Sequence, residues 1–243
     1  MSQKKHLNPI NIVISKVSQL LQKINIFGFK LKIRKNVQIV HDKFKIIDKR
    51  SLVLNKRKIK LLNYYSMISK NAPKGDIVEC GLGRLQSFQM LKLLNESKTI
   101  FGFDSFCGFP NPTKEDQSER NPQKGDWNIV DYYDVKKFLE KNNYQKFTLV
   151  KGYVEETAPI WKNKITKISI LHIDLDLHNG YKCVLNNFFD RVVSGGYILF
   201  DEYNNPKFPG ARLAVDNFFK KKKEKIKKFQ ILESEFKYFI KKL

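Results

Sequence analysis

Short apolar runs alternate with helix-like stretches over most of the chain. Five runs have the length and continuous hydrophobicity of buried strands: Ile77–Cys80, Thr99–Phe103, Thr148–Lys151, Ile168–Ile173 and Tyr197–Asp201. Helical spacing of apolar residues predicts helices over Leu52–Ser69, Leu85–Leu94, Asp131–Asn142, Gly180–Phe189 and Gly210–Lys223. This alternation predicts an α/β fold, with a mostly parallel sheet and helices on both faces. The final FKYFIKKL is expected to add an antiparallel edge strand.

The first 70 residues follow a different pattern and are predicted to form a basic N-terminal arm or cap. Residues 71–243 then form the main domain. Polar residues interrupt the apolar stretch NPINIVISKVSQLLQKINIF at helical spacing, which favours an amphipathic helix over a signal peptide. Such a helix docks on the domain or a partner, or lies on a membrane surface. Residues 28–50 fit a short hairpin or irregular arm.

The positive charge is concentrated in the same N-terminal part. The whole chain has a net charge of +22, and residues 1–75 hold 18 Lys and Arg against 2 Asp and Glu. The remaining residues hold 28 against 22. A basic region attracts nucleic acid, anionic lipid or phosphorylated substrates without selecting among them. The lysine richness is equally consistent with a compositional habit of the source proteome.

The cysteines and the apolar runs limit where the protein works. Three cysteines, Cys80, Cys107 and Cys183, have no metal-ligand spacing and indicate free thiols in a reducing compartment, the cytoplasm. No apolar run reaches about 18 residues, so no membrane span is expected. The long polar segment NPTKEDQSERNPQKGDWN is typical of a lid, a binding loop or a disordered loop. Its Asp126 and Trp127 contact a ligand or form a structural turn.

A glycine turn follows the first predicted strand in IVECGLGRLQSF. Glu79 ends the strand, and Gly81 and Gly83 lead into the next helix, where glycine allows a ligand to approach the backbone. The pattern is not G-x-G-x-x-G, because Gln86 stands at the third position, so a tight turn without ligand stays open. Asp104 ends the second strand, where a carboxylate binds ribose hydroxyls or caps a turn. Together these residues favour a nucleoside cofactor.

Carboxylates follow two later strands, in LHIDLDLHNG and GGYILFDEY. They are Asp174, Asp176, Asp201 and Glu202. Parallel strands end at the same edge of a sheet, so these side chains are expected to converge there, unless they are only solvated acids in turns. Hard oxygen ligands of this kind favour Mg²⁺, Mn²⁺ or Ca²⁺ over zinc. His172 is interpreted as packed on its strand, and His178 as either packed or part of the site.

Six ordered blocks between Gly75 and Phe219 resemble the macrocin O-methyltransferase (TylF) family of S-adenosylmethionine-dependent sugar methyltransferases. The blocks are GDIVECGLGR, FGFDSFCGFP, KGYVEET, LHIDLDL, SGGYILFDEY and PGARLAVDNFF. The resemblance implies a seven-stranded, Rossmann-like methyltransferase sheet. It departs from the family at Leu85 and Gln86, where the family has a Gly-Gly pair, and at Glu202, where it has Asp. His178 and Asn179 also differ from the usual Tyr and Glu.

The resemblance also implies roles for single residues. The residues implied to hold S-adenosylmethionine are Glu79, Gly81, Gly83, Asp104 and Ser105. Those implied to hold Mg²⁺ or another divalent cation are Asp174, Asp201 and Glu202. Asp176 corresponds to the general base that takes the proton of the acceptor hydroxyl.

The expected function is therefore metal-dependent O-methylation of a sugar hydroxyl. The sugar is nucleotide-linked or part of a surface polysaccharide or secondary metabolite, and the basic arm suits a phosphorylated acceptor. A nucleic-acid methyltransferase is the alternative, but the acidic residues would repel a phosphate backbone and no RNA-binding module is recognisable. A non-catalytic binding protein on the same fold also stays open. The sequence does not determine the oligomeric state, for which a homodimer is one candidate.

Overall fold

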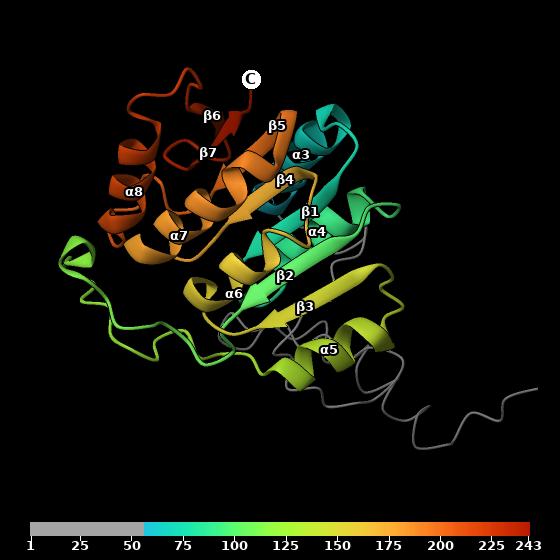
Figure 1. Ribbon diagram of the computed structural model, residues 1–243, viewed down its shortest axis with the longest axis horizontal. Helices are drawn as coiled ribbons and strands as arrows, with labels where there is room; N and C mark the ends of the chain where they lie inside the picture. Colours follow the sequence, from blue (N-terminus) through green and yellow to red (C-terminus); the bar gives the residue numbers. More distant parts are fainter. Residues whose placement is uncertain (1–55) are drawn as a thin grey trace, which may run out of the picture. The chain divides into compact units, whose positions relative to one another are not determined.

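The order of the strands in the sheet differs from their order in the chain. The computed structural model describes residues 56–243, and their seven strands form one sheet in the order β3-β2-β1-β4-β5-β7-β6 (Figure 1). The strands are β1 (Asp76–Cys80), β2 (Ile100–Asp104), β3 (Phe147–Lys151), β4 (Ile168–Ile173), β5 (Val192–Phe200), β6 (Lys227–Gln230) and β7 (Phe236–Lys241). The first five are parallel, and β7 pairs antiparallel with both β5 and β6. The predicted α/β fold with a mostly parallel, seven-stranded sheet is confirmed.

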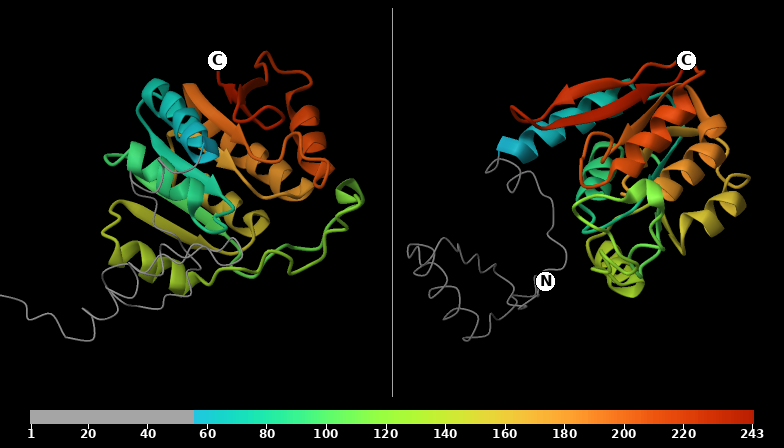
Figure 2. Two further views of the ribbon diagram at one scale, coloured as in Figure 1. Left: turned by 180° about the vertical axis from the view of Figure 1, so that it is seen from behind. Right: turned by 90° about the vertical axis from the view of Figure 1, so that its left-hand side faces the viewer.

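Six helices cover the two faces of the sheet. They are α3 (Lys56–Asn71), α4 (Gln86–Leu94), α5 (Tyr132–Lys141), α6 (Val154–Trp161), α7 (His178–Phe188) and α8 (Pro209–Phe219). Two short 3₁₀ helices, η1 (Lys114–Asp116) and η2 (Phe189–Arg191), lie between them. Helices α3, α4 and α5 share one apolar core with the sheet, and α6, α7 and α8 share the other (Figure 2). Neighbouring residues such as Ile77 and Val78 enter opposite cores, because side chains alternate along a strand.

The parallel strands all end at one edge of the sheet. Their arrowheads point the same way in Figure 1, and the long segment between β2 and α5 runs along that edge. This segment contains η1, where Thr113 and Asp116 form a reciprocal capping box and Asp116 is buried. The polar loop, expected to be a lid, a binding loop or disordered, therefore has local structure of its own beside the strand ends.

The C-terminal strands differ from the prediction. FKYFIKKL forms β7, which is antiparallel as expected, but β7 lies between β5 and β6 and is not the edge strand. The edge strand is β6, which begins at the end of the lysine-rich run KKKKEKIKK, residues 220–228. Helix α8 stops at Phe219, earlier than the predicted Lys223. Helix α6 was not predicted, because Pro159 stands inside it and the helix is short.

Helix α3 belongs to the core beneath the sheet. Its Leu61, Tyr64, Tyr65 and Ile68 are buried and share a cluster with Phe239 of β7. The amphipathic helix and the hairpin predicted before residue 51 lie outside the described residues. Within residues 56–243, none of the helices combines the length and the apolar character that crossing a membrane requires.

Candidate active site

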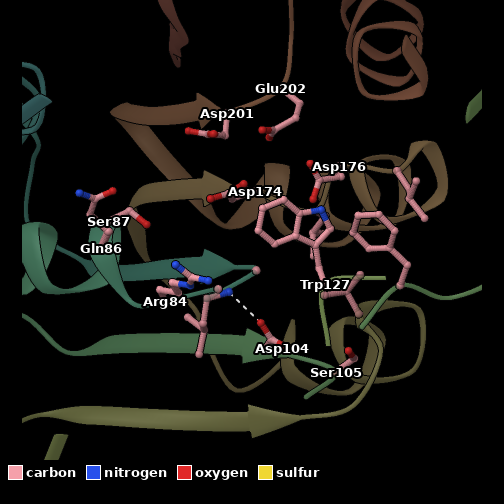
Figure 3. Close-up of a pocket in the computed structure, with 18 of the residues that line it drawn as sticks. Arg84, Gln86, Ser87, Asp104, Ser105, Trp127, Asp174, Asp176, Asp201 and Glu202 are labelled. Atoms are coloured by element: carbon pink, nitrogen blue, oxygen red, sulfur yellow. Dashed lines mark hydrogen bonds between the residues drawn. The ribbon is translucent and has the colours of Figure 1, made fainter. Parts of the chain in front are cut away.

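A pocket opens where β1, β2, β4 and β5 end. It has a volume of about 350 Å³, in the range of small-molecule sites. Most of the residues predicted to be functional line this pocket: Gly81, Gly83, Asp104, Ser105, Asp174, Asp176, Asp201 and Glu202. Figure 3 shows the acids of β4 and β5 on one side of the pocket and Asp104 with Ser105 on the other. The structure therefore brings together residues that are up to 121 positions apart, from Gly81 to Glu202.

The two glycines of the first turn serve different purposes. Gly81 has a φ of +87°, and a Cβ at this position would overlap the carbonyl oxygen of Asp174. Glycine at Gly81 thus lets the end of β1 pack directly against the end of β4. Gly83 has a φ of +44°, and a Cβ there would meet no atom within 4 Å among the described residues. Gly83 therefore leaves open space on the wall of the pocket, where a ligand can approach the backbone.

Asp104 connects the turn after β1 with the turn after β2 through two hydrogen bonds. Its Oδ2 accepts a hydrogen bond from the backbone N–H of Leu82 at 2.8 Å (Figure 3). Its Oδ1 accepts one from the backbone N–H of Phe106 at 2.8 Å. Burial raises the pKa of Asp104, and these amide bonds oppose the rise. Each carboxylate oxygen can accept a further bond, so hydrogen bonding to a ribose hydroxyl is compatible with this arrangement.

Ser105 lines the pocket but uses its hydroxyl locally. The Oγ donates to the carbonyl oxygen of Gly108 at 2.8 Å and accepts from the N–H of Cys107 at 3.1 Å. These bonds hold the turn after β2.

Glu79 lies beneath the pocket and does not line it. Its side chain is fully buried, its Oε1 accepts from the hydroxyl of Ser87, and His172 Nδ1 lies 3.2 Å from the same oxygen. The other oxygen, Oε2, is buried and has no hydrogen-bond partner within residues 56–243. Of the five residues predicted to hold the cofactor, Glu79 is thus the one that the structure separates from the others.

The acids after β4 and β5 form a cluster with strongly perturbed protonation. Burial and the charge of Asp201 raise the pKa of Asp174 to about 7. Burial, with the neighbouring carboxylates, raises the pKa of Asp176 and Glu202 well above their usual values. Burial alone would also raise the pKa of Asp201, but the charges of Lys237 and His172 hold it below its usual value. Such mutual repulsion is relieved by a cation.

Two features of this cluster are compatible with a bound divalent cation. His172, Asp174 and Asp201 each offer one ligand atom, and these three atoms lie within 4.8 Å of one another. Glu202 Oε2 is buried and finds no hydrogen-bond partner in the described part of the chain. Oxygen donors of this kind suit Mg²⁺, Mn²⁺ or Ca²⁺. His172 is better explained as a buried partner of two acids, since its Nε2 also lies 3.9 Å from Asp201 Oδ1.

His178 and Asp126 take structural positions. The backbone N–H of His178 donates to Asp116 Oδ1 at 2.7 Å, and His178 does not line the pocket. Asp126 Oδ2 accepts from the N–H of Gln123 at 3.0 Å and pairs with Arg120 at 2.8 Å, so Asp126 holds a turn. Both residues support the segment along the strand ends.

Trp127, next to Asp126, points into the pocket. Its side chain lines the pocket and is 54% exposed. In Figure 3 the indole lies between Asp104 and the acidic cluster in projection. Trp127 therefore stands where a bound ligand would contact it.

Sequence reasoning missed Lys237. This residue lies on β7 and its Nζ donates to Asp201 Oδ1, with 11% of the lysine side chain exposed. The antiparallel pairing of β7 with β5 indicates the position of Lys237. Phe200 is opposite Tyr238, so one step further along the antiparallel ladder Asp201 lies opposite Lys237.

The fold and this pocket define a methyltransferase-like class of α/β protein. The crystal structure of CalS11, a calicheamicin methyltransferase, has a TM-score of 0.70 at 20% identity and covers 99% of this chain and 97% of that one. The structure of the O-methyltransferase NovP has a TM-score of 0.62 at 21% identity, over 76% of this chain and 80% of that one. Both similarities concern the fold.

The chain belongs to the macrocin O-methyltransferase (TylF) family, whose sequence profile matches residues 42–235. The family resemblance inferred from the six blocks is thereby confirmed. A curated relative, mycinamicin III 3''-O-methyltransferase of Micromonospora griseorubida, is 25% identical over 161 residues. The match spans 59% of this chain and 60% of the length of that relative.

Proposed function

We propose that this protein transfers a methyl group from S-adenosylmethionine to a sugar hydroxyl, with a divalent cation held by the acidic cluster. The observation that carries the proposal is the meeting of the glycine turn and four carboxylates in one pocket. Family membership supports methyl transfer to oxygen, and the curated relative is named for 3''-O-methylation of mycinamicin III. We expect a sugar of a secondary metabolite or a nucleotide-linked sugar as the acceptor.

The cofactor half of the pocket is formed by the ends of β1 and β2. The open space beside Gly83 admits a ligand close to the backbone, and Asp104 is placed to accept from ribose hydroxyls. Gly81 and Ser105 hold the surrounding turns in shape. Glu79 acts from below, through its contacts with Ser87 and His172, in support of the turn.

Three side chains in the other half of the pocket are assigned to the cation: Asp174, Asp201 and Glu202. When bound, S-adenosylmethionine supplies the methyl group, and a divalent ion orients the acceptor hydroxyl and lowers its pKa. The unpartnered Glu202 Oε2 and the mutual repulsion of the acids support this assignment. Glu202 is longer than the aspartate usual in the family, and its carboxylate still reaches the pocket lining.

Asp176 is assigned as the general base. It lines the pocket in a left-handed backbone conformation, with a φ of +61°, just beyond the proposed cation ligands. Burial and the neighbouring carboxylates raise its pKa, and a cation at those carboxylates would counter the rise and leave Asp176 ionised to accept a proton. One of its carboxylate oxygens would take the proton of the acceptor hydroxyl, and the methyl group would pass from the sulfonium sulfur to the acceptor oxygen, with S-adenosylhomocysteine as the leaving product. Binding of both substrates in one pocket supplies the alignment that this attack needs.

The direct test is methyl transfer from radiolabelled S-adenosylmethionine to a panel of nucleotide-linked and secondary-metabolite sugars. Transfer should stop when the protein is treated with EDTA and recover when Mg²⁺ is added. Transfer that continues unchanged in EDTA would remove the cation from the proposal. S-adenosylhomocysteine should raise the melting temperature through binding to the folded state. An unchanged melting temperature at saturating S-adenosylhomocysteine would favour a non-catalytic protein on this fold.

A further inference from the structure

Lys237 brings a positive charge into the acidic cluster from a strand outside the parallel part of the sheet. Strand β7 runs antiparallel beside β5, and its register sets Lys237 opposite Asp201. The ammonium Nζ donates to Asp201 Oδ1, with 11% of the lysine side chain and 21% of the aspartate side chain exposed. A lysine that is this far buried needs a negatively charged partner, so the contact is a built feature of the site.

The same ammonium faces the other acids of the site. Lys237 lines the pocket together with Asp174, Asp176 and Glu202. His172 approaches the same oxygen of Asp201 from the β4 side, at 3.9 Å. One oxygen of Asp201 is thus directed toward two cationic side chains. The four acids remain a cluster because part of their charge is balanced by the protein itself.

The charge balance supplied by Lys237 is incomplete. Glu202 Oε2 is buried and receives no hydrogen bond from any residue in the range 56–243. A divalent cation can therefore bind at the carboxylate oxygens that Lys237 leaves without a partner. Because like charges repel, an ion at those acceptors is disfavoured by the ammonium of Lys237 nearby.

We propose that Lys237 is an internal counter-ion that keeps the Asp174, Asp201 and Glu202 site assembled without a divalent cation and weakens the binding of that cation. This inference rests on the cation assignment in the proposed function. The lysine sets the affinity of the site: the acids stay folded together at low cation concentration, and the ion exchanges readily. Removal of the positive charge raises the affinity of the site for the divalent cation.

The test measures Mn²⁺ binding to the EDTA-treated full chain by electron paramagnetic resonance, without methyl donor or acceptor. Lys237→Met removes the charge and keeps the length of the side chain, and Lys237→Gln removes the charge but keeps a donor for Asp201. Both variants should bind Mn²⁺ at least about tenfold more tightly than the wild type. Lys237→Arg keeps the charge and should stay within about threefold of the wild type.

A matched control lies on the same strand. Lys241→Met removes one positive charge at the other end of β7, where the exposed Lys241 is paired with Tyr197, and its Mn²⁺ affinity should stay within about threefold of the wild type. Melting temperatures give a second readout. Lys237→Met should melt below the wild type in EDTA, and saturating Mn²⁺ should close this gap.

The possible results distinguish failure of this inference from failure of the proposed function. If the wild type binds Mn²⁺ and neither Lys237→Met nor Lys237→Gln binds it more tightly, Lys237 is not an opposing charge and the inference fails, while the proposed function stands. If the wild type binds Mn²⁺ weakly and both charge-removing variants bind it at least about tenfold more tightly, the inference holds. If only the charge-removing variants bind Mn²⁺, the natural protein has no cation site and the cation assignment fails. If no variant and no wild-type protein binds Mn²⁺, the cation assignment fails, and the inference fails with it.

Discussion

His172 Nδ1 lies 3.2 Å from Glu79 Oε1, and both side chains are buried. The two residues are direct neighbours in the sheet, because the register of β1 and β4 pairs Glu79 with His172. Burial alone would lower the pKa of His172, but the nearby carboxylates of Asp201 and Glu79 raise it to about 10. The imidazole is therefore charged at neutral pH and joins the glycine turn of β1 to the acids that follow β4 and β5.

Replacement of this histidine should destabilise the whole domain. His172→Gln leaves the carboxylate of Glu79 buried beside a neutral side chain, and loss of one partner of a buried pair costs about 3–5 kcal/mol. Urea unfolding in EDTA measures the change in the free energy of unfolding. The double variant Glu79→Gln/His172→Gln removes both charges and should recover a large part of the loss. Wild-type stability in His172→Gln alone would show that the pair contributes nothing.

The assignment of Asp176 as the base can be tested with little disturbance of the backbone. Asp176 has a φ of +61°, a conformation that asparagine also tolerates, so Asp176→Asn should keep the local fold. Loss of a general base should reduce turnover by about 100-fold or more, while affinity for S-adenosylhomocysteine changes less than about twofold. Asp190→Asn, at an exposed position of η2, should have wild-type kinetics. A wild-type turnover in Asp176→Asn would take this role away from Asp176.

Asp104 is predicted to support cofactor binding through both of its oxygens. Asp104→Asn replaces one acceptor by an NH₂ group, so the N–H of Leu82 or Phe106 loses its partner. The NH₂ group also cannot accept from a ribose hydroxyl, and loss of a hydrogen bond to a charged group costs about 1.5–3 kcal/mol, which corresponds to a loss of about 10- to 150-fold in affinity for S-adenosylhomocysteine. Calorimetric titration measures this affinity.

The chain offers a matched control for this substitution. Asp131 caps α5 with a single oxygen, Oδ1, which accepts from Tyr133 and Asp134. Asparagine can keep that oxygen, so Asp131→Asn should leave cofactor affinity unchanged. Equal affinities for Asp104→Asn and the wild type would mean that the hydrogen bonds of Asp104 are not needed for binding.

The parallel part of the fold could be predicted because its strands are buried on both faces. Ile168–Ile173 was predicted with the bounds that β4 has, since a continuous apolar run leaves little choice. Strand β6 could not be predicted, because its sequence KKFQ is half charged and mostly exposed and gains its strand structure from pairing with β7. Helix α6 was missed for a local reason, since Pro159 within it indicates a break.

The residues of the candidate site could also be predicted only in part. Acids that directly follow parallel strands were predicted to meet, because the sheet determines where such strands end. Lys237 was missed, because its position depends on the register of an antiparallel strand that hydrophobicity does not specify. The contact between Glu79 and His172 had a signal that was not used. Each is a polar residue at the last position but one of an apolar strand. The two strands, β1 and β4, are neighbours in the sheet, so the two side chains meet.

Trp127 should report ligand binding by its fluorescence. The chain has two tryptophans. Trp127 is exposed and lines the pocket, whereas Trp161 packs against Phe101 and Phe103 with ring centroids 5.9 and 6.0 Å apart. Binding of S-adenosylhomocysteine should therefore change the emission of Trp127 and leave that of Trp161 nearly constant, because the emission of an indole depends on its surroundings. Trp127→Phe should lose the ligand-dependent change, and Trp161→Phe should keep it. A full change in Trp127→Phe would show that the ligand does not reach the part of the pocket between Asp104 and Asp176.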